Sequence, residues 1–295
     1  MLASRGKPDW LKIRAPTDTK KFDHIKSTLR KHGLHTVCEE SHCPNVPDCW
    51  ANEGTATFMV LGDECTRGCK FCNVKTRWSA KPPDADEPQK LARAVAEIGL
   101  DYIVITSVDR DDLKDQGSAH FAACIRAVKA LAPEMLVEVL TPDFRGDREC
   151  IRTVVEANPN VYAHNIETVR RLQSTARDKR AGYEQSLGVL RYIKDLNPKI
   201  YTKSSIIVGF GETQEEVLQT MDDLRASRVD ILTIGQYLRP SEWHLPVTEY
   251  VKPEVFELYK QEALRRGFLF VAAGPFVRSS YKAGELFIKH ALQKA

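Results

Sequence analysis

Short apolar runs that alternate with helical patterns constrain the fold of this chain more than any other feature. The runs are rich in β-branched residues and span 55–62, 102–107, 135–140, 161–165, 201–209 and 230–238. Helical periodicity fills the intervals at 88–98, 117–131, 147–157, 183–196 and 213–226. Such alternation gives parallel strands joined by right-handed crossovers. Six units fit either a partial barrel or a doubly wound sheet, and both architectures bind ligands at the C-terminal ends of the strands.

The segments outside this pattern are less regular. Residues 1–55 are rich in Lys, Pro and Cys, and we expect them to be irregular. A last helix at 254–266, a short apolar run at 268–274 and a tail follow the sixth strand. Polar residues gather where the predicted strands end, and they are Asp63, Ser107, Asp109, Thr141, Asn165, Glu167 and Glu212.

Composition limits the classes of function. The 295 residues are 42% hydrophobic and 28% charged, which is ordinary for a globular protein. A formal charge of +3 is too small to indicate a nucleic-acid partner. No stretch approaches the ~20 apolar residues of a membrane span, and residues 1–16 lack the apolar core of a signal peptide. Eight cysteines without an export signal indicate metal binding or catalysis in a reducing, cytoplasmic compartment.

Six of these cysteines form two triplets. "CEESHCPNVPDCW" holds Cys38, Cys43 and Cys49, and "CTRGCKFC" holds Cys65, Cys69 and Cys72 directly after the first strand. A metal or cluster site usually has four ligands or one position left open. Zinc is one interpretation, with His35 or His42 completing the first triplet, but the spacing of the second triplet fits zinc poorly. The other cysteines, Cys124 and Cys150, lie at apolar-periodic positions and are expected to be buried and inert.

The second triplet carries a resemblance. Cys-x3-Cys-x-aromatic-Cys, with Phe71 before the last cysteine, resembles the radical S-adenosylmethionine (SAM) superfamily. The resemblance implies a [4Fe–4S] cluster on Cys65, Cys69 and Cys72, whose open iron chelates SAM. It also implies a partial (β/α)6 TIM-like barrel with N- and C-terminal extensions, divided as 1–55, 56–272 and 273–295.

The same resemblance suggests residues that contact SAM. "SSIIVGFGE" (204–212) is similar to the superfamily pattern Gly-x-Ile-x-Gly-x-x-Glu, with Ser205 in place of the first glycine. The candidate cofactor-binding residues are Phe71, Ser107, Asn165, Glu167, Lys203, Ile207, Gly209 and Glu212. For Asn165 and Glu167 helix capping is an alternative to ribose binding. Lys203 either pairs with the methionine carboxylate or is an ordinary strand lysine.

Further motifs resemble the lipoyl synthase family in order from residue 38 to 281, among them "TSVDRDDLKDQGS", "HNIETV", "LTIGQYLRPSEWHLPV" and "GPFVRSSY". The resemblance implies that Cys38, Cys43 and Cys49 hold a second [4Fe–4S] cluster with Ser280 as its fourth ligand. Arg278 would help to hold or release that serine. Departures are mild, for example Ala273 where the family has Ser. Oxygen is a harder partner for iron than thiolate, so such a site suits a cluster that is taken apart.

The implied activity is that of a sulfurtransferase. It inserts two sulfur atoms, at C6 and C8 of a protein-bound octanoyl-lysine, with the second cluster as sulfur donor. The implied partners are an octanoylated carrier (glycine-cleavage H protein or a 2-oxoacid dehydrogenase E2 domain), a low-potential electron donor and an iron–sulfur assembly or repair protein. A basic segment is either a docking site for the carrier or a solvated helix face, and its charged residues are Arg170, Arg171, Arg177, Lys179 and Arg180.

Three rival functions remain open from the residues themselves. Two are other two-cluster radical enzymes, a methylthiotransferase and a biotin-synthase-like sulfur inserter. The third is a non-enzymatic zinc protein with two cysteine sites. Colour separates the zinc protein from the radical enzymes, because iron–sulfur clusters are brown and zinc sites are colourless.

Overall fold

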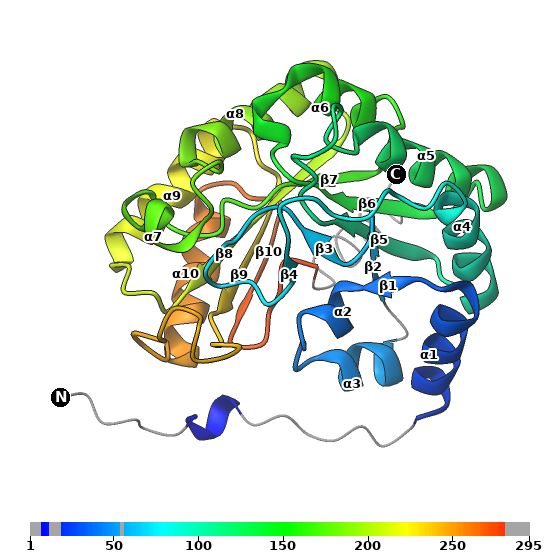
Figure 1. Ribbon diagram of the computed structural model, residues 1–295. Helices are drawn as coiled ribbons and strands as arrows, with labels where there is room; N and C mark the ends of the chain where they lie inside the picture. The colour runs from blue at the N-terminus through cyan, green and yellow to red at the C-terminus, as the bar shows by residue number, and fades with distance from the viewer. Residues whose placement is uncertain (1–6, 12–18, 54–55, 281–295) are drawn as a thin grey trace.

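A computed structural model describes residues 7–11, 19–53 and 56–280 of the chain (Figure 1). Its framework is an eight-stranded sheet in the order β1-β2-β5-β6-β7-β8-β9-β10. The strands are β1 (His35–Thr36), β2 (Thr57–Val60), β5 (Tyr102–Ser107), β6 (Leu136–Leu140), β7 (Val161–Ala163), β8 (Tyr201–Val208), β9 (Ile231–Gln236) and β10 (Phe270–Gly274). All pairs from β2 to β10 are parallel, and β1 is antiparallel to β2. The curved sheet is an unclosed barrel, because in the described residues β1 and β10 are its two edges.

The longer helices surround the convex face of this sheet (Figure 1). They are α1 (Lys20–His32), α4 (Glu87–Ile98), α5 (Ser118–Leu131), α6 (Arg148–Val155), α8 (Tyr183–Leu196), α9 (Gln214–Ala226) and α10 (Pro253–Arg265). The short helices α2 (Val37–Glu40), α3 (Val46–Asp48) and α7 (Gln173–Ala176) lie near the cysteine segments. A two-stranded sheet of β3 (Glu64–Cys65) and β4 (Lys75–Thr76) follows β2. The predicted α/β partial barrel is confirmed. No helix among the described residues is long and apolar enough to cross a membrane.

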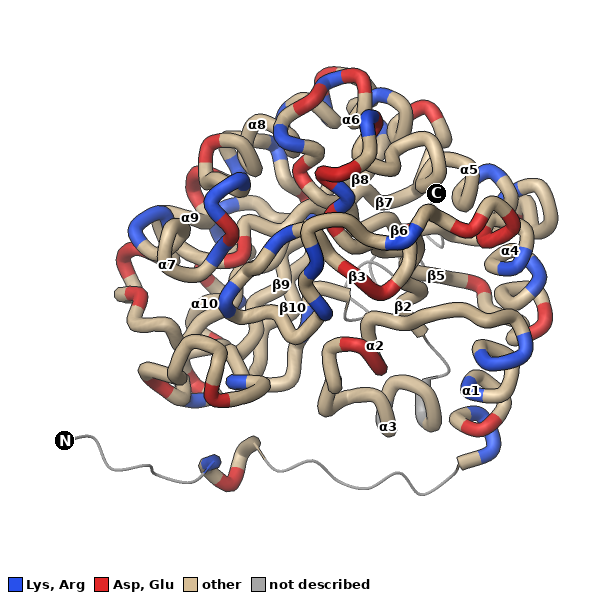
Figure 2. Tube along the Cα trace, in the orientation of Figure 1, with Lys and Arg blue, Asp and Glu red and all other residues tan. Residues whose placement is uncertain are grey.

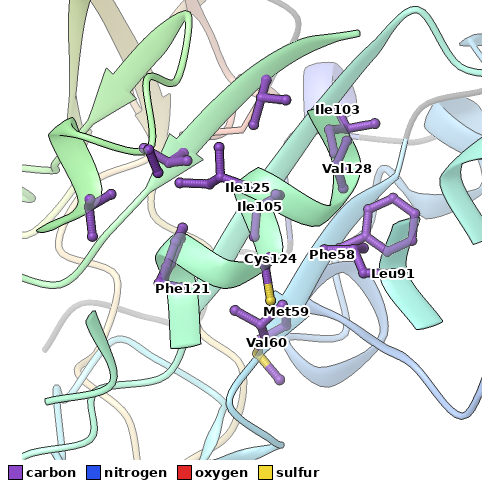
Figure 3. Close-up of a cluster of buried hydrophobic side chains, with 14 of the residues drawn as sticks. Phe58, Met59, Val60, Leu91, Ile103, Ile105, Phe121, Cys124, Ile125 and Val128 are labelled. Atoms are coloured by element: carbon purple, nitrogen blue, oxygen red, sulfur yellow. The ribbon is translucent and has the colours of Figure 1, made fainter. Parts of the chain in front are cut away.

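Alternation along the strands separates two apolar regions. On β5, Ile103 and Ile105 point outward and pack with Phe121 and Ile125 of α5 (Figure 3). Tyr102 and Val104 of the same strand belong to a separate cluster with buried residues of β7 and β9. That cluster fills the inside of the barrel, because only the concave face brings these strands together. Each fully buried aliphatic side chain in these clusters stabilises the fold by roughly 1.5–3 kcal/mol.

The expectation that residues 1–55 are irregular is wrong. Residues 20–32 form α1, whose buried Ile25 and Leu29 are four positions apart on one face of the helix. The helix ends at Gly33, which has the left-handed conformation that favours glycine (φ 63°). Eight of the thirteen residues of α1 are charged or histidine, and they hid this periodicity. The apolar run at 268–274 contains one more strand, β10, which pairs with β9.

A capping box begins α9, and the predicted burial of Cys124 and Cys150 is confirmed. Thr213 caps α9, and the side chain of Glu216 accepts a hydrogen bond from the Thr213 N–H in return, which makes a capping box. Cys124 and Cys150 are buried, at 0% and 5% exposure. None of the eight cysteines, all of which belong to the described residues, forms a disulfide.

Candidate functional site

A cavity of about 260 Å³ lies at the C-terminal ends of the parallel strands. Cys65, Cys69 and Cys72 line it together, as the barrel architecture requires of a ligand site. Five of the predicted SAM contacts also line it, and they are Phe71, Ser107, Asn165, Glu167 and Ile207. The structure thus brings residues from strands β5 to β8 to the second cysteine triplet.

Backbone hydrogen bonds hold the cysteine loop on both sides. The Thr66 N–H donates to the Asp109 carbonyl (2.9 Å), and the Arg77 N–H donates to the Cys65 carbonyl (2.8 Å). Within the loop, the Cys72 N–H donates to the Cys69 carbonyl (3.1 Å). The three thiols therefore have a defined orientation before any metal binds.

Burial determines the protonation of these thiols. It raises the pKa of Cys69 to about 12 and that of Cys72 to about 11, and it raises the pKa of Cys65 as well. Backbone N–H groups of Arg67 and Asp178 donate to the sulfur atoms of Cys65 and Cys69, at 3.4 and 3.3 Å. The free site is a trithiol, and metal binding must release its protons. The same N–H donors would tune the reduction potential of a bound cluster.

The spacing of the thiols does not fit a single zinc ion. A tetrahedral zinc site holds its sulfur ligands about 3.8 Å apart, from Zn–S bonds of about 2.3 Å. In the described part of the chain, ligand atoms lie within 4.8 Å of one another in two groups, Glu87/His120/Cys124 and His35/Glu40/Asp63. Neither group contains a cysteine of either triplet. The wider arrangement suits a multi-iron cluster better.

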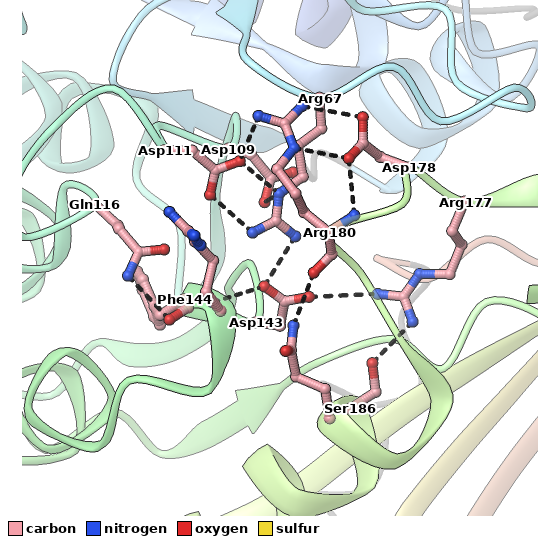
Figure 4. A network of polar contacts seen from close by, with 12 residues as sticks. Arg67, Asp109, Asp111, Gln116, Asp143, Phe144, Arg177, Asp178, Arg180 and Ser186 are labelled. Atoms are coloured by element: carbon pink, nitrogen blue, oxygen red, sulfur yellow. Dashed lines mark hydrogen bonds and ion pairs between the residues drawn. The ribbon is translucent and has the colours of Figure 1, made fainter. Parts of the chain in front are cut away.

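An ion-pair network anchors the cysteine loop from behind (Figure 4). The buried guanidinium of Arg67 contacts Asp111 through Nε (2.8 Å), Asp143 through Nη1 (2.8 Å) and Asp109 through Nε (3.2 Å). Asp109 lies beside Cys65, 3.7 Å from its sulfur, and burial raises the Asp109 pKa to about 6. The sequence pattern predicts Asp109 at the end of a strand but does not predict Arg67. The position of Arg67, a charged residue between two cysteines of one motif, is the feature that could have indicated its role.

The network continues through Asp143 to Arg177, whose side chain also reaches the cavity. Arg177 donates to the Ser186 hydroxyl at 2.8 Å. Buried His164 contacts the same hydroxyl at 2.9 Å and the Thr141 carbonyl at 3.0 Å. Burial and the nearby Arg177 lower the pKa of His164 to about 4, so this imidazole is neutral near pH 7.

Two hydroxyls of the cavity wall lack a partner inside the protein. Ser107 Oγ and Thr141 Oγ1 are buried and make no hydrogen bond to the described residues. Both residues line the cavity. Unsatisfied buried hydroxyls are uncommon, and a polar ligand in the cavity would satisfy them. The residues present therefore fit a polar cofactor beside three thiols.

Asn165 and Glu167 form a unit at the end of β7. The Asn165 amide donates to the Glu167 carboxylate at 3.2 Å, and Glu167 has a left-handed φ of 68°. The Glu167 N–H and carbonyl bond to Ser205 and Ile207 of β8. Burial raises the pKa of Glu167. Neither side chain caps a helix, so the alternative of helix capping is wrong.

Three of the predicted SAM contacts lie away from the cavity wall. Lys203 is buried inside the barrel, where its ammonium is 2.6 Å from Glu138 Oε1, so it is not the exposed strand lysine of the alternative. The Glu212 carboxylate accepts from the Gly209 and Phe210 N–H groups. A Cβ on Gly209 would lie 2.8 Å from the Glu249 carbonyl oxygen, so this glycine permits close backbone packing. These contacts count against direct SAM binding by Lys203 and Glu212, which stays a prediction.

The first triplet meets the C-terminal segment, as expected. The Asn45 amide donates to the Phe276 carbonyl at 2.5 Å. Half-buried Arg278 lies near Cys43 and Cys49, and its guanidinium donates to the Val277 carbonyl at 2.8 Å. Desolvation lowers the Arg278 pKa. Ser279 lines the cavity of the second triplet, and Ser280 next to it is half-buried. Residues 276–280 therefore lie between the two cysteine triplets.

The predicted docking segment 170–180 is mostly engaged within the protein. Arg177 is only 7% exposed, and Arg180 pairs with Asp178 and Asp111. Arg170 and Arg171 pair with acidic residues of α8 and α9. The docking role predicted for Arg177 is wrong, because a buried guanidinium cannot contact another protein.

Comparison with known proteins identifies the family. The family model described as "Radical SAM superfamily" matches residues 59–224, more than half of the chain. A second model, "N-terminal domain of lipoyl synthase of Radical_SAM family", matches residues 3–43. The lipoyl synthase of Anaeromyxobacter sp. (strain Fw109-5) is 59% identical over 283 residues, which cover 96% of this chain and 95% of that protein. The chain belongs to the lipoyl synthase family.

A more distant member of the lipoyl synthase family and one solved structure extend the comparison. A protein named "Lipoyl synthase, apicoplast" from Plasmodium falciparum (isolate 3D7) is 54% identical over 284 residues, covering 96% of this chain and 68% of its own. A crystal structure of methylornithine synthase has a TM-score of 0.55 and 15% identity over 73% of this chain and 63% of that one. That likeness concerns the fold alone. The resemblance to a radical SAM enzyme is confirmed.

Proposed function

We propose that this chain is a lipoyl synthase that inserts two sulfur atoms, at C6 and C8 of an octanoyl group linked to a lysine of a carrier protein. Membership of the family carries the reaction type. The structural observation that supports it is the position of residues 276–280 between the two cysteine triplets. In a sulfur-inserting enzyme, the radical source and the sulfur source must both reach the same bound substrate, because positioning controls where a radical reacts.

Cys65, Cys69 and Cys72 would hold a [4Fe–4S] cluster, and Cys38, Cys43 and Cys49 with Ser280 would hold a second one. When bound, the first cluster and SAM supply one-electron chemistry that activates unreactive C–H bonds, and the second supplies sulfur. Arg278 would position Ser280, since its guanidinium lies near Cys43 and Cys49 of the same site.

The remaining cavity residues would bind and orient SAM and the substrate. Ser107 and Thr141 offer hydroxyls without an internal partner to a polar ligand. Asn165 and Glu167 present an amide and a carboxylate to ribose hydroxyls. Met59, Val74, Leu140 and Ile207 form an apolar wall that keeps water away from the reacting carbon. The Arg67 network keeps the cysteine loop fixed throughout.

The free thiols favour a reducing compartment such as the cytoplasm. An electron donor of low potential and a protein that rebuilds the second cluster complete the set of proposed partners. The carrier is an octanoylated H protein or E2 domain.

The decisive experiment uses anaerobically reconstituted protein with SAM, a reductant and an octanoyl-lysine peptide. The peptide should gain the mass of two sulfur atoms, and the protein should be brown with about eight irons per chain. A colourless zinc protein, or a brown protein that leaves the peptide mass unchanged, contradicts the proposal.

Single substitutions separate SAM cleavage from sulfur insertion. Ser280→Ala should still cleave SAM while sulfur insertion falls, and full insertion would exclude Ser280 as a ligand. Cys124→Ala serves as the control, because this cysteine is on α5 and belongs to neither triplet, so iron content and insertion should be unchanged.

A further inference from the structure

Two tryptophan side chains face solvent almost completely. Trp243 is 95% exposed and Trp78 is 89% exposed, while Trp50 is buried in the core. Tryptophan is the residue most enriched in the energetic centres of protein interfaces, because it buries a large rigid surface at low entropic cost. Two such side chains in water indicate a surface that a partner covers.

Both tryptophans neighbour residues that bond the cysteine loop. Trp78 follows Arg77, whose N–H donates to the Cys65 carbonyl at 2.8 Å. Trp243 precedes His244, whose Nε2 hydrogen-bonds the Cys72 carbonyl at 3.0 Å. Each tryptophan is therefore one residue away from a contact with a cysteine of the second triplet. The backbone on which each tryptophan stands is therefore bonded to the cysteine loop that lines the cavity.

A second bond ties the two segments together. The Leu245 N–H donates to the Lys70 carbonyl at 3.1 Å, so the loop after β9 lies on the cysteine loop. Thr76, two residues before Trp78, lines the cavity itself. The two tryptophans thus belong to segments that flank the cavity entrance.

The segment that contains Trp78 carries charges of one sign. Segment 70–81 contains Lys70, Lys75, Arg77 and Lys81 and no acidic residue. All four side chains belong to exposed residues, and the cations gather around β4 (Figure 2). Asp63 and Glu64 neutralise Lys75 and Arg77, which leaves Lys70 and Lys81 facing solvent. A partner surface that complements this segment is acidic.

We propose that Trp78, Trp243 and the basic segment 70–81 form the docking surface for an acidic face of the carrier domain that presents the octanoyl-lysine. The proposal rests on the proposed function, which requires the substrate lysine to enter the cavity from a folded protein. A carrier docked here places that lysine at the entrance. The arginines of segment 170–180 are paired within the chain, which leaves Lys179 as its exposed cation outside those pairs. That segment therefore offers less free charge than segment 70–81.

The test compares two substrates, an octanoylated carrier domain and a short octanoyl-lysine peptide. Removing both tryptophans (Trp78→Ser with Trp243→Ser) should raise the KM for the carrier about tenfold or more, as loss of interface hot spots does. The KM for the peptide should not change. Leu131→Ser is the matched control, since Leu131 is also an exposed apolar residue (53%) but lies at the end of α5, at the opposite end of the strands.

A binding measurement checks the same surface without turnover. Tryptophan emission of the wild-type protein should shift to shorter wavelength when the carrier is added, and the double variant should lose this shift. Lys81→Glu should weaken carrier binding more at low salt than at high salt. The carrier used is an acidic lipoyl domain bearing octanoyl-lysine.

Each result separates this proposal from the proposed function. If the wild-type protein modifies neither substrate, the proposed function fails. If it modifies both and the double variant binds the carrier like the wild type, the docking surface is refuted. If the tryptophan substitutions abolish self-association of the protein and leave carrier binding unchanged, the surface joins two copies of this chain and the proposal is overturned.

Discussion

Gly235→Ala should detach the C-terminal segment from the mouth of the barrel. Gly235 lies on β9, and a Cβ there would be 2.1 Å from the Val277 carbonyl oxygen and 3.1 Å from the Val277 carbonyl carbon. Ordinary contact begins near 3.4 Å, so the segment must move by about 1.3 Å. Both clashing atoms belong to the backbone, so a rotamer change cannot relieve the overlap. Overpacking of this kind costs about 1–3 kcal/mol.

The movement should affect the first cysteine triplet and spare the second. Residues 276–278 carry the Phe276 carbonyl that accepts from Asn45 and the guanidinium that lies near Cys43. Iron content after reconstitution should fall from about eight toward four per chain, the share of one [4Fe–4S] cluster. SAM cleavage should persist while sulfur insertion declines. The midpoint of thermal unfolding of the metal-free protein should fall by about 2–4 °C per kcal/mol lost.

Gly274→Ala is the matched control for this experiment. Gly274 pairs with Gly235 across the β9–β10 ladder, yet its added Cβ would meet only the Val277 side chain, at 3.4 Å. It should keep iron content, SAM cleavage and sulfur insertion near wild type. If Gly235→Ala also retains eight irons and full insertion, contact between the C-terminal segment and β9 is not needed to build the first site.

Three further predictions concern stability. His164 has a folded pKa of about 4, below its ordinary value of about 6.5, so its contribution to stability is present above pH 6.5 and is lost as the pH falls toward 4. Between pH 7.5 and 5, urea unfolding of the wild type should lose about 2 kcal/mol more than His164→Gln, and parallel pH profiles would contradict this assignment. Thr213→Ala removes the cap of α9 and should cost about 1 kcal/mol in urea unfolding, whereas Thr213→Ser should cost little. Arg67→Lys breaks the paired contacts with Asp111 and should cost about 1–3 kcal/mol, and an unchanged midpoint would show that the network does not stabilise the fold.

The second triplet could be predicted from the sequence because its ligands are close together along the chain. Its three cysteines lie within eight residues after a strand, so their spacing alone implied a common site, and the cavity confirms that they share one. The parallel strands were equally readable, because β-branched runs and helical periodicity are local patterns. The helix at 20–32 was missed because charged residues separate its few apolar positions.

Contacts between distant segments were not readable in this way. Arg67 is bound by Asp109, Asp111 and Asp143, which follow it by 40 to 80 positions, and no local pattern announces such pairing. Arg177 looked like a surface charge in a basic run, but the fold buries it against Asp143. Lys203 faces the inside of the barrel, where Glu138 from a different strand neutralises it.

The sequence by itself determined the chemical class of this protein, because thiol spacing, strand periodicity and family motifs are properties of neighbouring residues. Tertiary structure alone decided which charges are free and which are paired. Side-chain burial depends on strands that curve into a barrel and bring remote residues together. The same curvature leaves Trp78 and Trp243 in solvent beside the cavity, although tryptophan is usually found inside. Only the folded chain shows that these two residues are exposed, whereas Arg177 of the basic run at 170–180 is buried.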